Sequence, residues 1–218
     1  MPVGKSTGVY NGVAYAKDGD LSVTLLYDVN GFIAGIQHGS SREVYGNLGF
    51  PSVKLQPPFN LVDNRYVLTA YFVDPSTICT SGRTQADFDS DGTGTGLWIQ
   101  NGSTPDQVTQ VPYYQTGLSG TNWTEGKCFI SMGKHYWYNV HPDTECDAFF
   151  PVFTLYNGGI LEAFGWAFLA DLSSSFYEHP TRYSAFMKVV PDCIRNLTGR
   201  FSTMHIFFTY APEIFNMC

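Results

Sequence analysis

The sequence predicts an all-β fold: a single-domain antiparallel sandwich or barrel-like sheet with long loops and at most short helices. Asn-Gly and Asp-Gly pairs stand between apolar runs, where they favour the tight turns of β-hairpins. The runs also follow one another too closely for strands and helices to alternate. With 44% hydrophobic and 16% aromatic residues, the chain has ample material for a core. Because no repeat or linker-like stretch is visible, we expect residues 1–218 to form one domain.

Three consecutive strands are predicted between residues 9 and 39. The turns that join them are marked by Asp18-Gly19 and by Asn30-Gly31, because both pairs tolerate the positive φ of hairpin turns. From residue 21 to residue 27, side chains alternate between a more apolar and a more polar face, as in a strand.

The rest of the chain is also predicted to consist of short strands joined by turns and loops. Strands are expected at 65–73, 96–100, 128–133, 135–140, 150–156, 160–170 and 202–210. A proline-rich surface loop is expected over 50–60, and a long polar loop over 101–127. The best helical candidate is the short stretch 182–190, which follows Pro180.

Charge and glycosylation signals indicate the environment of the protein. The formal net charge is −7, and no basic run is present, so we expect no nucleic-acid partner. No stretch approaches the roughly 18 consecutive apolar residues of a membrane span. Asn-X-Ser/Thr sequons stand at Asn101, Asn122 and Asn196. Together with five cysteines, they predict a secreted, extracellular glycoprotein whose leader has been removed.

The five cysteines contain no Cys-X-X-Cys pair, which excludes a zinc ribbon or a thioredoxin motif. Two disulfides and one odd cysteine are the simplest expectation. The sequence does not determine the pairing, but Cys128 and Cys146 flank one strand–loop unit, and we expect a bridge between them.

Alternating aspartates make residues 87–92 a candidate calcium loop. Asp87, Asp89 and Asp91 followed by Gly92 match the start of an oxygen-ligand loop. Trp98 stands where an EF-hand needs its bidentate glutamate, so an EF-hand is excluded. A bound Ca²⁺ that braces a loop of another kind and an ordinary acidic surface turn are both left open.

Aromatic residues gather in the second half of the chain and predict a pocket for a hydrophobic or aromatic small molecule, such as a lipid or a pigment. On the segment 160–170, large aromatic side chains alternate with Ala and Gly, which suits a strand that lines a cavity. The candidate ligand-binding residues are Trp137, Phe153, Phe164, Trp166, Phe168 and Phe207 as the apolar wall, with His135 and Tyr138 as polar contacts.

Two other classes of function stay open. An extracellular structural or interaction protein, braced by calcium or not, would hold no organic ligand. A secreted hydrolase or oxidoreductase would bring together titratable groups from distant strands. The chain has no serine-hydrolase elbow of the Gly-X-Ser-X-Gly type, and His135 and His141 lie too far apart on a strand to share one metal ion. A non-enzymatic binding protein is therefore the leading hypothesis.

Overall fold

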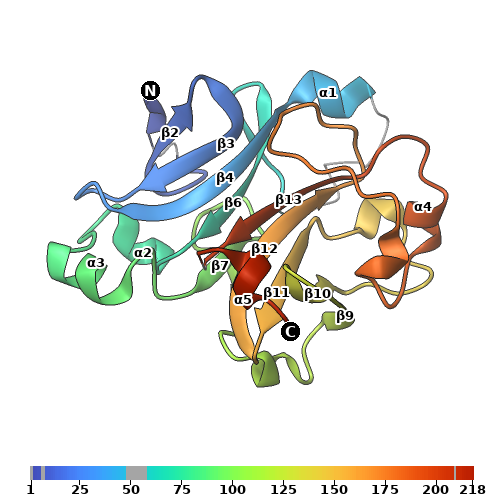
Figure 1. The fold of residues 1–218 in the computed structure, drawn as a ribbon. Helices are drawn as coiled ribbons and strands as arrows, with labels where there is room; N and C mark the ends of the chain where they lie inside the picture. Colours follow the sequence, from blue (N-terminus) through green and yellow to red (C-terminus); the bar gives the residue numbers. More distant parts are fainter. Residues whose placement is uncertain (1, 6–7, 48–57, 209) are drawn as a thin grey trace. The chain divides into compact units, whose positions relative to one another are not determined.

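The computed structural model describes residues 2–5, 8–47, 58–208 and 210–218 (Figure 1). It confirms the all-β prediction, because two antiparallel sheets account for all the named strands and the helices are short. The chain divides into two compact units. One consists of 1–47 and 57–111, and the other of 48–56 and 112–218. The expectation that 1–218 is one domain stays a prediction.

The first unit contains an eight-stranded sheet with the order β1-β2-β3-β4-β6-β7-β8, and β5 pairs with β6. The strands are β1 (Pro2–Lys5), β2 (Val13–Lys17), β3 (Asp20–Tyr27), β4 (Ile33–Ser41), β5 (Asn60–Val62), β6 (Arg65–Tyr71), β7 (Leu97–Gln100) and β8 (Val108–Val111). Short helices are α1 (Arg42–Asn47), α2 (Pro75–Ile78) and α3 (Gln85–Asp91). The predicted turns at residues 18–19 and 30–31 are confirmed, and Asp18, Gly19 and Gly31 have positive φ.

Strand β3 shows how tertiary structure selects the buried face. Thr24 and Leu26 are buried, whereas the more apolar face of Leu21, Val23 and Leu25 is only partly buried. Thr24 can be buried because its hydroxyl donates to Gln37 Oε1 at 3.4 Å, and Gln37 in turn donates to Thr69 Oγ1 at 2.9 Å.

The second unit contains a five-stranded antiparallel sheet with the order β13-β12-β11-β10-β9. Its strands are β9 (Trp123–Phe129), β10 (Gly133–Tyr138), β11 (Val152–Asn157), β12 (Ile160–Phe168) and β13 (Ser202–Phe207). The short helical turns of this unit are η2 (Gln115–Leu118), η3 (Cys146–Ala148), η4 (Tyr183–Ala185), α4 (Asp192–Arg195) and α5 (Pro212–Phe215). The turn between β11 and β12 has positive φ at Gly158 and Gly159.

Three expectations about local structure need correction. The stretch 101–127 is not one loop, because β8 and most of β9 lie within it. Residues 128–133 do not form one strand: β9 ends at Phe129, and β10 begins at Gly133 after a hairpin turn. The candidate helix 182–190 is reduced to the single turn η4. Most of the expected loop 50–60 lies outside the described residues.

Two disulfides are present, as expected, but the predicted pairing between Cys128 and Cys146 was wrong. Cys128 is bonded to Cys218, with 6.0 Å between their Cα atoms, and Cys146 is bonded to Cys193, with 5.3 Å. Cys79 is the odd cysteine and is exposed. The first bridge holds the C-terminal residue next to β9, a proximity that no local sequence pattern encodes. Among the described residues, no helix is long and apolar enough to cross a membrane.

Candidate functional site

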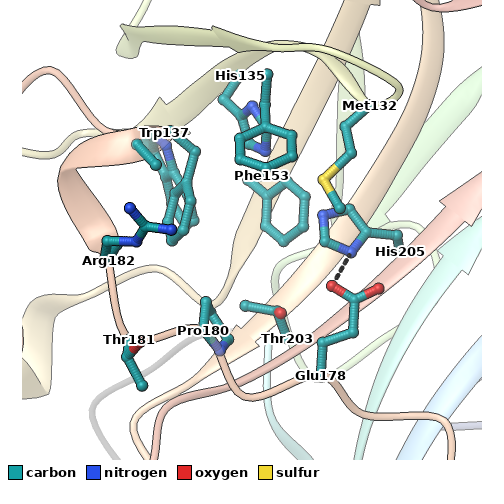
Figure 2. Close-up of a pocket in the computed structure, with 13 residues that line it drawn as sticks. Met132, His135, Trp137, Phe153, Glu178, Pro180, Thr181, Arg182, Thr203 and His205 are labelled. Carbon is teal, nitrogen blue, oxygen red and sulfur yellow. Dashed lines mark ion pairs between the residues drawn. The ribbon is translucent and has the colours of Figure 1, made fainter. Parts of the chain in front are cut away.

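A cavity of about 450 Å³ opens on one face of the five-stranded sheet (Figure 2). This volume is within the range of small-molecule pockets in proteins. Strands β10, β11 and β13 supply one side of it, and the segment from Glu178 to Phe186 supplies the other. The lining residues are Phe129, Met132, His135, Trp137, Phe153, Glu178, Pro180, Thr181, Arg182, Ala185, Phe186, Thr203 and His205.

Strand alternation and register explain why these side chains meet. His135 and Trp137 are two residues apart on β10 and so point to the same side of the sheet. Trp137 is paired with Phe153 of β11, and their ring centroids are 5.0 Å apart. The aromatic rings thus form a continuous wall, since the ring of Phe153 also lies 5.0 Å from that of His205.

The small residues of β12 make room for this wall. Gly165 pairs with Phe153 on one side and with His205 on the other. A Cβ atom at residue 165 would lie 2.2 Å from Cζ of Phe153, which is closer than two non-bonded carbon atoms approach each other. Gly165 therefore lets the Phe153 ring lie directly over the backbone of β12. Ala163 and Ala167 are buried in the same apolar cluster as Trp137 and Phe153.

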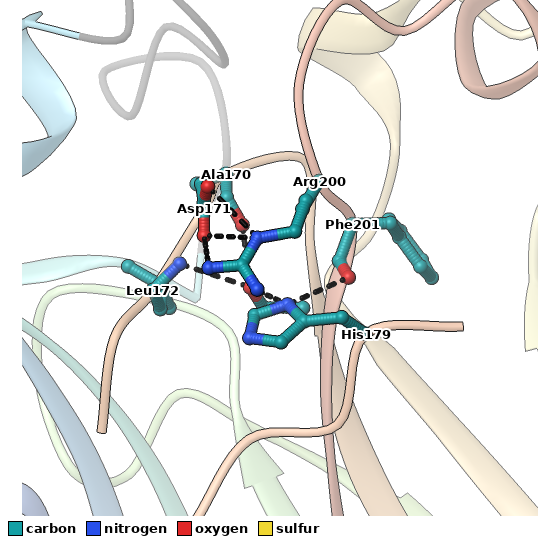
Figure 3. Close-up of polar contacts among 7 residues, drawn as sticks. Ala170, Asp171, Leu172, His179, Arg200 and Phe201 are labelled. Carbon is teal, nitrogen blue, oxygen red and sulfur yellow. Dashed lines mark hydrogen bonds and ion pairs between the residues drawn. The ribbon is translucent and has the colours of Figure 1, made fainter. Parts of the chain in front are cut away.

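A polar network lies at the start of β13 and involves the segment that begins at Ala170 (Figure 3). The hydroxyl of Ser202 donates to Ala170 O at 2.6 Å and accepts from Leu172 N at 3.0 Å. The Arg200 guanidinium binds both carboxylate oxygens of Asp171 through Nε, at 2.9 and 3.0 Å. These contacts connect the segment that begins at Ala170 to the start of β13.

The backbone next to this network positions Glu178. The backbone of Glu178 exchanges two hydrogen bonds with the backbone of Thr203, at 2.8 and 2.9 Å, and so forms an isolated bridge to β13. Glu178 Oε2 then lies 3.3 Å from Nδ1 of His205. The contact with the His205 ring lowers the pKa of Glu178, so the side chain is a carboxylate at neutral pH.

His135 is a buried neutral base that lines the cavity beside Trp137 and Phe153. It is 2% exposed, and its Nδ1 lies 3.2 Å from Lys127 O. Burial lowers the pKa of His135 to about 3, and the nearby His205 adds to this effect. The imidazole therefore stays uncharged at neutral pH.

Several buried polar atoms at the cavity have no hydrogen-bond partner within the described part of the chain. They are Nε1 of Trp137, Oγ1 of Thr203 and both ring nitrogens of His205. Buried polar groups are normally hydrogen-bonded, and leaving one unmatched costs on the order of 1–3 kcal/mol. The cavity thus combines apolar rings with polar groups that can pair with a bound molecule.

The structure brings together only some of the predicted ligand-binding residues. Trp137, Phe153 and His135 line the cavity. Phe207 packs against the apolar cluster that includes Trp137 and Phe153, but it is not among the lining residues. Tyr138 points to the other side of β10, where its ring lies 5.2 Å from that of Trp123.

The three large aromatic residues of β12 also lie away from this cavity. Phe164, Trp166 and Phe168 alternate with the small residues and are therefore on the opposite face of the sheet, almost fully buried. The alternation along β12 is as predicted, but the small side chains, not the large ones, lie on the side of the cavity.

Sequence reasoning missed several residues that complete the site: Phe129, Glu178, Arg182, Phe186 and His205. One signal could have found His205. Residues 203, 205 and 207 alternate along the predicted last strand, which places a histidine on one face with Thr203 and Phe207. Glu178 and Arg182 lie in a segment without regular structure, and nothing in the local sequence ties that segment to β13.

The aspartates of the candidate calcium loop belong to α3, not to a loop. Thr84 and Asp87 form a capping box, in which the Asp87 carboxylate accepts hydrogen bonds from Thr84 N at 2.8 Å and from its hydroxyl at 2.7 Å. Asp89 lies two residues further along the helix, about 200° around its axis. No group of three His, Cys, Asp or Glu residues that could hold a metal ion occurs among the described residues. Calcium binding stays a prediction.

The three sequon asparagines differ in their surroundings. Asn196 is exposed directly after α4, and Asn122 is exposed beside Tyr138, whose hydroxyl lies 3.4 Å from its Nδ2. Asn101 is only partly exposed, and its Nδ2 donates to Thr109 Oγ1 at 2.6 Å. Asn122 and Asn196 are therefore more accessible acceptors for a glycan than Asn101.

Three comparisons, with protein-family models, with curated proteins and with solved structures, give no match for this chain. The chemistry of its own residues therefore carries the functional argument.

Proposed function

We propose that the protein binds an aromatic small molecule in the cavity of the five-stranded sheet, and that it acts as a secreted, glycosylated binding protein. The observation that carries this proposal is the wall of aromatic rings from Trp137, Phe153 and Phe186 around a cavity of about 450 Å³. Apolar concave sites with a few placed polar groups are the usual form of small-molecule pockets. The two disulfides and the exposed Asn196 support an extracellular setting.

Planar ligands suit this wall better than flexible chains do. The ring of Trp137 lies 5.0 Å from that of Phe153 and 5.9 Å from that of Phe186, with interplanar angles of 36° and 32°. Tilted rings at this spacing offer faces on which a further flat ring can stack. The proposed ligand class is therefore an aromatic molecule, one of the two classes, hydrophobic or aromatic, expected from the sequence.

The test compares two phenylalanines of similar exposure in the same unit. Phe129 lines the cavity and is 38% exposed, whereas Phe176 is 41% exposed and is not a lining residue. We expect Phe129→Ala to weaken the binding of a two-ring aromatic probe, 2-naphthol, by about fivefold, because one stacking surface is lost. Phe176→Ala should bind the probe like the parent protein.

Equilibrium dialysis measures the free and bound probe directly. Native mass spectrometry of the protein secreted from eukaryotic cells shows in addition whether a ligand is retained and whether glycans are attached. No binding of the probe and no retained ligand would refute the proposal and leave the interaction-protein hypothesis. Chemical conversion of a bound molecule would favour the hydrolase or oxidoreductase hypothesis instead.

A further inference from the structure

His205 offers the cavity a hydrogen-bonding atom whose character is set by its neighbour. Its side chain is 8% exposed, and its Nδ1 lies 3.3 Å from Oε2 of Glu178, an ion-pair contact that is not aligned as a hydrogen bond (Figure 2). The negative charge of this carboxylate beside Nδ1 favours the imidazole tautomer that carries its proton on Nδ1. In that tautomer Nε2 is left with a lone pair and acts as an acceptor.

This acceptor is buried and unmatched. Nε2 of His205 has no hydrogen-bond partner among the described residues. Thr203 lies two residues away on the same face of β13 and is 3% exposed. Its hydroxyl also has no hydrogen-bond partner in the described part of the chain. A ligand group that fits both must donate a hydrogen bond to Nε2, whereas the Thr203 hydroxyl can either donate to that group or accept from it.

We propose that the ligand carries a hydroxyl group, phenolic or alcoholic, which donates its hydrogen bond to Nε2 of His205. This inference rests on the proposed function, because it concerns the same cavity. A hydroxyl both donates and accepts, whereas an ether oxygen or a carboxylate can only accept. A carboxylate would also lie near the negative charge of Glu178. Glu178 is a positioning residue here, since it acts on the ligand through the imidazole.

The experiment measures how the parent protein discriminates among three probes that share two fused rings: 2-naphthol, 2-methoxynaphthalene and naphthalene. Equilibrium dialysis at pH 7.5 gives the Kd of each. We expect 2-naphthol to bind at least about tenfold more tightly than 2-methoxynaphthalene, because the ether leaves the buried Nε2 without a donor. Naphthalene should resemble the ether, since it also lacks a donor.

Two substitutions test the roles of the two side chains. His205→Phe keeps an aromatic ring but removes the acceptor, so the ratio of the two Kd values should fall below about twofold. Glu178→Gln removes the charge that orients the tautomer, and its amide can donate to Nδ1 as well as accept, so the ratio should fall to an intermediate value. Glu178 is largely exposed, so this second variant tests the inference even if His205→Phe does not fold.

Glu145→Gln is the matched control, because Glu145 is exposed in the same unit and does not line the cavity. It should keep the selectivity of the parent protein. If all three probes bind with equal affinity, or if Glu178→Gln leaves the ratio unchanged, the hydroxyl inference is refuted while the pocket stands. If no probe binds, the proposed function itself fails.

Discussion

Acidification should destabilise the protein well above the pH at which ordinary carboxylates titrate. His38 on β4 is fully buried, and burial lowers its pKa to about 3, with a backbone hydrogen bond to Ser22 opposing the shift in part. His135 has the same low pKa for the same main reason. An unfolded histidine has a pKa of about 6.5.

The sign and size of the effect follow from proton linkage. Between pH 6.5 and pH 3 the unfolded state binds more protons than the folded state, so the free energy of unfolding decreases as the pH falls. Each histidine contributes a slope of about 1.4 kcal/mol per pH unit in this window. From pH 7 to pH 5, each should therefore cost roughly 2 kcal/mol of stability.

Urea unfolding at pH 7, 6 and 5 measures this slope. His38 and His135 belong to different compact units. If the chain unfolds in one step, the loss should total about 4 kcal/mol. If the units unfold separately, each transition should lose about 2 kcal/mol. The same data thus test the single-domain prediction.

Substitutions separate the two contributions. His38→Gln should remove about half of the summed pH dependence, whatever its effect on absolute stability, because the titrating group is gone. His141→Gln is the control, since His141 is exposed. An unchanged slope in His38→Gln would refute the assignment of the acid sensitivity to a buried neutral histidine.

Three further predictions concern packing, metal binding and helix capping. Gly165→Ala should destabilise the protein by about 1–3 kcal/mol in urea unfolding, because the new Cβ would collide with Phe153 and with the backbone of Met204. An unchanged unfolding midpoint would contradict the packing described. Chelation with EDTA should leave the Tm unchanged, since the Asp87 carboxylate already caps α3, and a drop in Tm would instead support the calcium hypothesis. Thr84→Ala, which removes the other half of the capping box, should cost about 1 kcal/mol.

Local rules in the sequence determined much of the fold. The Asp18-Gly19 and Asn30-Gly31 turns and the alternating strands were predictable, because hairpin turns and strand periodicity depend on neighbouring residues. The helix α3 was not predicted, since the aspartate spacing resembles an ion loop while the capping box with Thr84 favours a helix.

The candidate site shows where local rules end. Trp137, Phe153 and His135 were predictable as candidates, because aromatic density and alternation are visible in the sequence. The sequence does not show which face of β12 borders the cavity, because this depends on what packs against each face. In the structure, the small residue Gly165 lies on the cavity side.

Long-range contacts decided the rest. Cys128 bonds to Cys218 across a separation of 90 residues, and Glu178 reaches His205 because its backbone pairs with Thr203 of β13. The sequence alone therefore determined an antiparallel β protein rich in aromatic residues. Tertiary structure decided which of these residues surround a cavity, because pairing between distant segments follows from the packing of the whole unit and not from the properties of either segment.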